Sequence, residues 1–220
     1  MALDPGIELF WYGHSMFVIS GDGTTVAVDP VPPEVGYRYD PVEADVVLMS
    51  HQHFDHSFIA GIKGSGSPNA ISAAGTFEVG RLTIEGIASY HDAQQGRQRG
   101  PNIIFTWEQG GMKLAHLGDL GDLPGPAVMK KLTGVDVAMV PVGGVFTIDG
   151  EQAARLVRDL APKVVLPMHY ATPDCSIKLD GPEVFTGRFS GEVRTIPDRP
   201  LKISADILPV KTEAWIVPYQ

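Results

Sequence analysis

The sequence contains a single cysteine, Cys175, among 220 residues. One cysteine cannot form an intrachain disulfide, and such sparing use of cysteine is typical of proteins in a reducing compartment. No apolar run is long enough to cross a bilayer, and residues 1–13 lack the basic region and apolar core of a signal peptide. These absences predict a cytoplasmic protein that has no membrane partner.

Basic residues are also scarce. The chain has 17 lysines and arginines against 26 aspartates and glutamates, and its net charge is −9 at pH 7. Non-specific nucleic-acid binding depends on Lys and Arg that neutralise phosphates, so we expect no nucleic-acid partner. A small-molecule substrate is expected instead. It can still be anionic, because a local cationic group can dominate the field inside a cleft.

The apolar content is that of a globular protein. Hydrophobic residues make up 44% of the chain, and charged residues make up 20%. A chain of this length and apolar content can build a sizeable core without disulfides. No repeat, low-complexity segment or long linker divides the sequence. We therefore predict a single domain over residues 1–220.

Short apolar runs bounded by turn residues predict buried strands. The predicted strands or strand pairs lie at residues 43–50, 81–90, 102–118, 136–142, 163–169 and 213–219. A helix with one apolar stripe is predicted over residues 148–162, and a shorter helix over residues 124–134. Strands that later alternate with helices favour two sheets with helices outside them.

Ionisable residues crowd the point where the first of these strands ends. The segment "SHQHFDH" at residues 50–56 follows the apolar run directly, and three later apolar runs also lead to a histidine or an aspartate. Loops that leave one edge of a sheet can converge on one point, so we predict a common site. Its candidate ligands are His51, His53, Asp55, His56, His91, Asp119 and His169.

The residue types indicate a metal site. Imidazole nitrogen and carboxylate oxygen are the usual ligands of catalytic zinc, and they also suit manganese and iron. We predict two divalent cations, with zinc the expected metal and manganese or iron compatible. The predicted division is His51, His53 and His91 for the first cation, Asp55, His56 and His169 for the second, and Asp119 as a bridge.

Such a site favours hydrolysis. Two divalent cations carry more positive charge than Asp55, Asp119 and a bridging hydroxide remove, so the site would attract an anionic substrate. A metal lowers the pKa of its bound water to about 7, and no serine or cysteine nucleophile is then required. We predict that Asp55 is catalytic: it would orient the hydroxide and return a proton to the leaving group.

The motifs "HQHFDH", "YHD" (90–92), "GDLG" (118–121) and "PMHY" (167–170) resemble, in order, the metal motifs of the metallo-β-lactamase fold superfamily. More narrowly, "WYGHSMFVI", "AVDP" and "PVGGVFTI" resemble a prokaryotic group of uncharacterised metal-dependent hydrolases. That group is similar to the L-ascorbate-6-phosphate lactonases. The resemblance implies an α/β fold, a four-layer αβ/βα sandwich of two mixed sheets with helices on both outer faces.

Three further residues are candidates for contacts around the ligands. The resemblance places His14 at a strand end near the site, where it would contact a ligand or the substrate, or serve only the structure. Asp29 in "VDP" is predicted to support the metal loops through hydrogen bonds, with a simple turn before proline as the alternative. His116 is predicted to be a hydrogen-bonded residue beside the site or in the core rather than a ligand.

Three others are candidates for substrate contact. Arg97 and Arg99 follow His91, and a guanidinium there could bind a phosphate or carboxylate in a bidentate manner. A solvated basic loop is the alternative reading of the same residues. Tyr170 could donate to an oxyanion, although packing is the favoured role.

The favoured hypothesis is a dinuclear metal-dependent hydrolase that acts on a small, anionic ester or lactone. One alternative is a phosphodiesterase or nuclease that uses the same metals, which a cleft lined by Lys and Arg would favour. Another is a metal-binding regulatory protein without turnover, but the complete ligand set argues against it. The resemblance is also compatible with a homo-oligomer.

Overall fold

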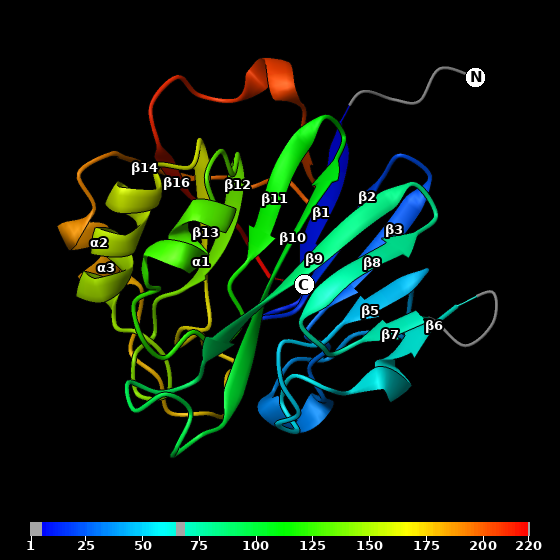
Figure 1. The fold of residues 1–220 in the computed structure, drawn as a ribbon, viewed down its shortest axis with the longest axis horizontal. Helices are drawn as coiled ribbons and strands as arrows, with labels where there is room; N and C mark the ends of the chain where they lie inside the picture. The colour runs from blue at the N-terminus through cyan, green and yellow to red at the C-terminus, as the bar shows by residue number, and fades with distance from the viewer. Residues whose placement is uncertain (1–5, 65–68, 220) are drawn as a thin grey trace.

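A computed structural model describes residues 6–64 and 69–219 of the protein. Two mixed β-sheets dominate it (Figure 1). The first sheet has six strands and is antiparallel as far as β3 and parallel beyond it. In spatial order its strands are β15 (Leu201–Ile203), β1 (Ile7–Trp11), β2 (Phe17–Gly21), β3 (Thr24–Val28), β5 (Val46–Leu48) and β7 (Asn69–Ile71).

The second sheet has eight strands. It is antiparallel from β8 to β11 and parallel from β11 to β14. In spatial order its strands are β14 (Glu192–Thr195), β16 (Glu213–Ile216), β13 (Val164–Met168), β12 (Val137–Pro141), β11 (Met112–His116), β10 (Pro101–Gln109), β9 (Leu82–Tyr90) and β8 (Gly75–Val79). A separate short ladder joins β4 (Val42–Glu43) to β6 (Ile62–Lys63).

The main core lies between the two sheets. Strand β2 illustrates why: Phe17 and Ile19 point into the main core, whereas Val18 between them belongs to a second apolar cluster on the other face. Side chains alternate along a strand, so a strand that is apolar at every position is buried on both faces. Burial of each such side chain contributes about 1.5–3 kcal/mol.

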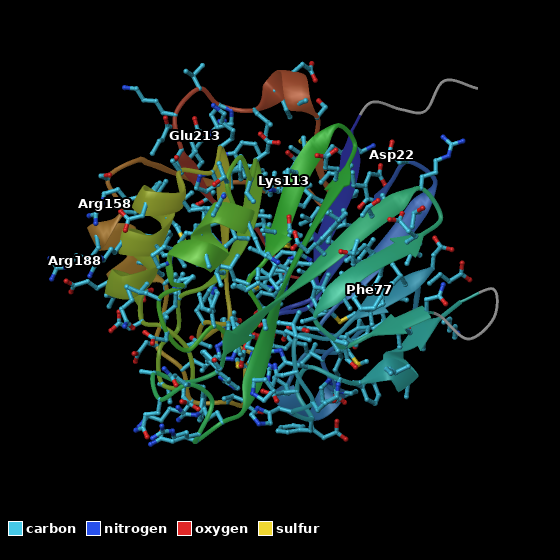
Figure 2. All side chains as sticks on the ribbon, viewed as in Figure 1. Asp22, Phe77, Lys113, Arg158, Arg188 and Glu213 are labelled. Carbon is cyan, nitrogen blue, oxygen red and sulfur yellow. The ribbon has the colours of Figure 1, made fainter. Side chains whose placement is uncertain are left out.

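Three α-helices lie together on one side of the molecule, away from the six-stranded sheet (Figure 1). They are α1 (Pro126–Lys131), α2 (Gly150–Leu160) and α3 (Glu183–Arg188). Helix α2 begins at a capping box, in which the Asp149 side chain accepts from the Gln152 N–H and the Gln152 side chain accepts from the Asp149 N–H. Its apolar stripe joins the main core, while Arg158 and Arg188 extend away from the sheets (Figure 2).

The layer over the six-stranded sheet differs from its expected form. Within residues 6–64 and 69–219, the outer face of this sheet is covered by the connection after β3 and by two 3₁₀ helices, η1 (Pro33–Val35) and η2 (Ile59–Gly61). α-Helices on both outer faces were expected from the resemblance. At η1 the helix ends after three residues, because Gly36 follows it in a left-handed conformation with φ +112°.

The predicted sandwich of two mixed sheets is confirmed. Each predicted strand region contains at least one observed strand, and the predicted helices correspond to α1 and α2. Strands β1 to β3, strands β6 to β8, the helices η1 and η2, and the elements after residue 175 other than β16 were not predicted. A third 3₁₀ helix, η3 (Ala205–Ile207), is one of these. None of the helices in the described residues is long and apolar enough to span a membrane.

Candidate metal centre

The candidate ligands follow the ends of four strands. His51 lies three residues after β5, His91 immediately after β9, Asp119 three residues after β11 and His169 immediately after β13. The loops that follow β9, β11, β12 and β13 lie together in the lower part of Figure 1. All seven predicted ligands fall into groups whose ligand atoms lie within 4.8 Å of one another.

Asp119 is the meeting point of these groups. Its Oδ2 atom lies 3.2 Å from the Nε2 atoms of both His56 and His169. The same oxygen is 3.4 Å from His91 Nε2 and 3.9 Å from His51 Nε2. One buried carboxylate oxygen is therefore faced by four imidazole nitrogens.

The side chains form two main groups around this carboxylate. The first group is His51, His53 and His91, and the second is His14, Asp55, His56 and His169. A third set, His51, His56 and Asp119, connects them. The division between the first two groups is the predicted one, with His14 added to the second.

Several atoms in these groups are buried without a hydrogen-bond partner. They include His51 Nε2, His56 Nε2 and Asp119 Oδ1. A buried polar atom that lacks a partner costs free energy, commonly about 1–3 kcal/mol. Divalent cations bound by nitrogen and oxygen donors would satisfy these atoms, so the side chains present fit the predicted metals.

Hydrogen bonds on the far side of two imidazoles leave their Nε2 atoms free. Asp29 accepts at Oδ2 from His56 Nδ1 at 3.0 Å and from Ser50 Oγ at 2.7 Å. The Ser50 hydroxyl is thus used as a donor to Asp29, and its oxygen accepts from His51 Nδ1 at 2.9 Å. In the metal-binding form both imidazoles would keep their proton on Nδ1 and present the Nε2 lone pair, as metal ligands require.

Burial favours the neutral form of His51 and His91 by lowering the pKa of each, whereas Asp119 and Asp29 outweigh burial at His56 and raise its pKa well above its usual value. Burial, reinforced by the charge of the neighbouring His56, lowers the pKa of His51 to about 3. A neutral imidazole is the form that binds a metal. Burial raises the pKa of Asp119, but His169 and His56 outweigh this effect and hold that pKa well below its usual value.

Tight backbone packing fixes Asp119 beside the histidines. Gly118 has φ +57°, and a Cβ atom there would lie 2.4 Å from Asn102 Oδ1 and 2.5 Å from Ser50 Cβ. Asn102 Oδ1 accepts the Asp119 N–H at 2.9 Å, and its Nδ2 donates to the carbonyl of Leu117. Sequence reasoning missed Asn102, whose only signal was an amide directly before the apolar run Ile103–Phe105 of β10.

Two loops border the cluster. The loop after β9 returns to it through the His91 N–H, which donates to the Gly100 carbonyl at 3.2 Å. The loop after β12 is joined to the Asp119 segment by the Ile148 N–H, which donates to the Leu120 carbonyl at 2.8 Å. The two loops therefore approach the candidate metal centre from β9 and β12 of the eight-stranded sheet, which β10 and β11 separate.

Arg99 connects these two loops. Its Nη2 donates to the Val145 carbonyl at 3.4 Å, and its guanidinium lies 5.2 Å from the centre of the Phe146 ring. Val145 has φ +59°, a strained conformation for a β-branched residue, and such strain is often found at functional sites. Arg97, by contrast, is exposed on the same loop.

The remaining candidates have structural surroundings. His116 is buried, and its Nε2 donates to the Ser15 carbonyl at 2.8 Å while its Nδ1 accepts from the Gly118 N–H. Tyr170 is buried and packs against Trp11, with 5.2 Å between ring centres. These contacts favour a hydrogen-bonded position behind the ligands for His116 and packing for Tyr170.

Comparison with known proteins gives consistent matches. The model of the beta-lactamase superfamily domain matches residues 8–169. A UPF0173 metal-dependent hydrolase of Myxococcus xanthus is 32% identical over 197 residues, which cover 75% of this chain and 71% of the relative. A similarly named protein of Thermoplasma acidophilum is 28% identical, over 90% of this chain and 99% of its own length.

A solved structure resembles the whole molecule. It belongs to a Thermotoga maritima protein assigned to the metallo-beta-lactamase superfamily as a zinc-dependent hydrolase. The two proteins are 30% identical with a TM-score of 0.78, and the match covers 97% of this chain and 100% of the other. An isothiocyanate hydrolase from Delia radicum gut bacteria, at 14% identity and a TM-score of 0.62, shares the fold.

Proposed function

Because the chain belongs to the beta-lactamase superfamily domain family and is a metal-dependent hydrolase, we propose that it cleaves a small anionic ester or lactone with two divalent cations. Zinc is the proposed metal, and manganese or iron is compatible with the same ligands. The proposal concerns the number of cations and the class of substrate.

The position of Asp119 carries the two-cation proposal. Its Oδ2 atom faces His91 and His51 of the first group as well as His56 and His169 of the second, at 3.2–3.9 Å. His51, His53 and His91 would hold one cation, and Asp55, His56 and His169 the other. A carboxylate that lies between two complete sets of ligands is suited to be a ligand of both cations.

The cations would supply a water of lowered pKa, about 7, and positive charge for the oxyanion that forms. The chain supplies orientation. Burial raises the pKa of Asp55, but the hydrogen bond from His14 and the neighbouring His56 outweigh it and hold that pKa well below its usual value. Asp55 therefore stays a carboxylate at neutral pH and can accept a hydrogen bond from the attacking water.

Arg99 supports an anionic substrate. Its guanidinium lies at the contact between the two loops that border the candidate metal centre, and its bond to the Val145 carbonyl is long at 3.4 Å. A substrate carboxylate or phosphate would bind this guanidinium more strongly than a neutral carbonyl does. The ring of Phe146, at 5.2 Å, offers an apolar surface beside the same cation.

The first test is the metal content of the protein purified without chelator, measured by elemental mass spectrometry. About two equivalents per chain are expected, as in other paired-metal sites. Asp119→Asn should retain much less metal, whereas Asp206→Asn, at an exposed position in η3, should retain the wild-type amount. Less than one equivalent after incubation with zinc, manganese or iron would contradict the two-cation proposal.

The second test is a substrate screen of the metal-loaded protein. Lactones and esters that carry a carboxylate or phosphate should be hydrolysed faster than their neutral analogues, and also faster than phosphodiesters. Faster cleavage of phosphodiesters would favour the nuclease alternative and leave the metal assignment intact. Retained metal without turnover of any of these classes would favour a regulatory protein.

A further inference from the structure

His14 lies in the turn between β1 and β2, and this turn is held from both sheets. The carbonyl oxygen of His14 accepts from Trp11 Nε1 at 3.1 Å and from the His169 N–H at 2.9 Å. The first donor belongs to the six-stranded sheet and the second follows β13 of the eight-stranded sheet. The position of His14 therefore depends on both sheets.

The imidazole of His14 faces the second group of ligands. Its ring centre is 4.2 Å from that of His169 and 4.9 Å from that of His56. Its Nε2 atom is 3.1 Å from Asp55 Oδ2 with hydrogen-bond geometry. The side chain of His14 is fully buried and that of Asp55 is 14% exposed, so water competes little for this bond.

The chemistry of the pair assigns the donor. An ionised carboxylate can only accept hydrogen bonds, so the proton between the two side chains resides on His14 Nε2. One oxygen of Asp55 is thereby fixed in direction, and the carboxylate cannot rotate freely about its terminal bond. Carboxylates that bind metals are commonly held by such partners, which orient the ligand and tune its affinity.

We propose that His14 is a positioning residue of the second metal site, where its Nε2–H holds Asp55 in the orientation that binds the cation. This inference rests on the proposed two-cation function. It adds a residue from the β1–β2 turn to a site whose other members follow β5 and β13. It also makes the second cation more dependent on His14 than the first, whose proposed ligands are His51, His53 and His91.

Three variants test the proposal. His14→Leu removes the donor, and His14→Gln keeps an amide N–H near the position of Nε2. Trp11→Phe is the matched control, because it removes a hydrogen bond to the backbone of the same turn and leaves the imidazole in place. The metal-free proteins are titrated with Zn²⁺ against a competing chelator, and the affinities of the first and second equivalents are measured together with the unfolding midpoint of each variant.

In His14→Leu we expect the second equivalent to bind about 10- to 100-fold more weakly, the usual effect of removing such a partner. The first equivalent should keep its affinity in every variant. His14→Gln should recover most of the affinity for the second equivalent. Trp11→Phe should lower the unfolding midpoint and leave both affinities unchanged.

Three results would overturn the proposal. The first is an unchanged second affinity in His14→Leu. The second is a loss in His14→Gln as large as in His14→Leu, which would indicate that the ring nitrogen itself is needed. The third is an equal loss in Trp11→Phe, which would assign the effect to the turn. A wild-type protein that binds one equivalent would instead remove the two-cation function together with this inference.

Discussion

Asp29 Oδ2 accepts a hydrogen bond from His56 Nδ1 at 3.0 Å, and both side chains are fully buried. The same carboxylate accepts from the backbone N–H and the hydroxyl of Ser50, both at 2.7 Å. Asp29 thus links the loop after β3 to both ends of the segment 50–56. The bond to Asp29 fixes the orientation of the His56 ring, so that its Nε2 atom faces the candidate metal centre.

Asp29→Asn should weaken metal binding about 10- to 100-fold. The amide would place an NH₂ group where Oδ2 now accepts from His56 and Ser50, so donors would face donors. The loss of a buried acceptor should also lower the free energy of unfolding by about 1–3 kcal/mol. Because asparagine tolerates the left-handed conformation of residue 29, φ +46°, the backbone contributes little to this loss.

Metal retention after dialysis and the urea midpoint of the metal-free variant measure the two effects separately. The control is Asp45→Asn, since the Asp45 side chain accepts a single exposed backbone bond among the described residues, from the Thr25 N–H. Equal metal retention in Asp29→Asn and in Asp45→Asn would contradict the assigned role.

Gly118→Ala should be strongly destabilising. The added Cβ would lie 2.4 Å from Asn102 Oδ1, and residue 118 has φ +57°. The strained conformation alone costs an alanine about 1 kcal/mol or more, and displacement of Asn102 would also move Asp119. Thermal unfolding and metal retention should both decrease.

Gly187→Ala is the matched control for this substitution. Gly187 lies within α3, where a Cβ would meet no atom within 4 Å. Alanine there should raise the free energy of unfolding by about 0.4–1 kcal/mol because it reduces the freedom of the unfolded chain. If both substitutions had the same sign of effect, the steric account of Gly118 would be wrong.

Arg99→Met should raise KM for an anionic substrate about 10- to 100-fold, the range expected when a charged hydrogen bond is lost. The same variant should leave KM for a neutral analogue nearly unchanged. Arg97→Met provides the comparison, because Arg97 is exposed on the same loop. An equal rise in KM for neutral and anionic substrates would assign Arg99 to loop structure alone.

Asp92 should make the loop after β9 sensitive to acid. Its carboxylate accepts four backbone N–H bonds, from Gln94, Gly96, Gln98 and Arg99, at 2.8–3.1 Å. Burial raises the pKa of Asp92, but these donors outweigh it, so the pKa lies below its usual value of 3.8. The stabilisation is therefore fully present above pH 3.8 and is lost as the pH falls through the lower folded-state pKa.

Hydrogen exchange of the Gln98 and Arg99 amides measures this directly. In Asp92→Asn both amides should exchange faster than in the wild type at neutral pH, because one amide oxygen cannot replace two carboxylate oxygens. Below the folded-state pKa the wild type should approach the variant. Identical protection of these amides at neutral pH would show that the carboxylate does not hold the loop.

The ligands could be predicted from the sequence because each follows an apolar strand. Such a position is a local property: the end of a buried strand leads to an edge of the sheet, and His51, His91 and His169 occupy three such ends. The "HQHFDH" spacing then indicated two groups. The two-sheet sandwich followed from the strands and from the family resemblance.

The surroundings of the ligands could not be predicted with the same detail. His14 and Asp55 are 41 residues apart and meet only because the β1–β2 turn and the loop after β5 lie at the same end of the six-stranded sheet. Asn102 and Asp92 act through backbone groups, and no residue pattern reveals which N–H a side chain will reach. Over the six-stranded sheet the described residues form η1 and η2 instead of an α-helix, and the resemblance implied this layer only in general.

The hydrogen bond between the His169 N–H and the His14 carbonyl crosses the seam between the two sheets. The candidate metal centre is assembled on that seam, with His51 and His56 contributed from one side and His91, Asp119 and His169 from the other. Separation of the sheets would dismantle the centre while each sheet kept most of its own strand pairing. Bound metal would thus link the two sheets to each other, and its release would be an early sign that the sheets had separated.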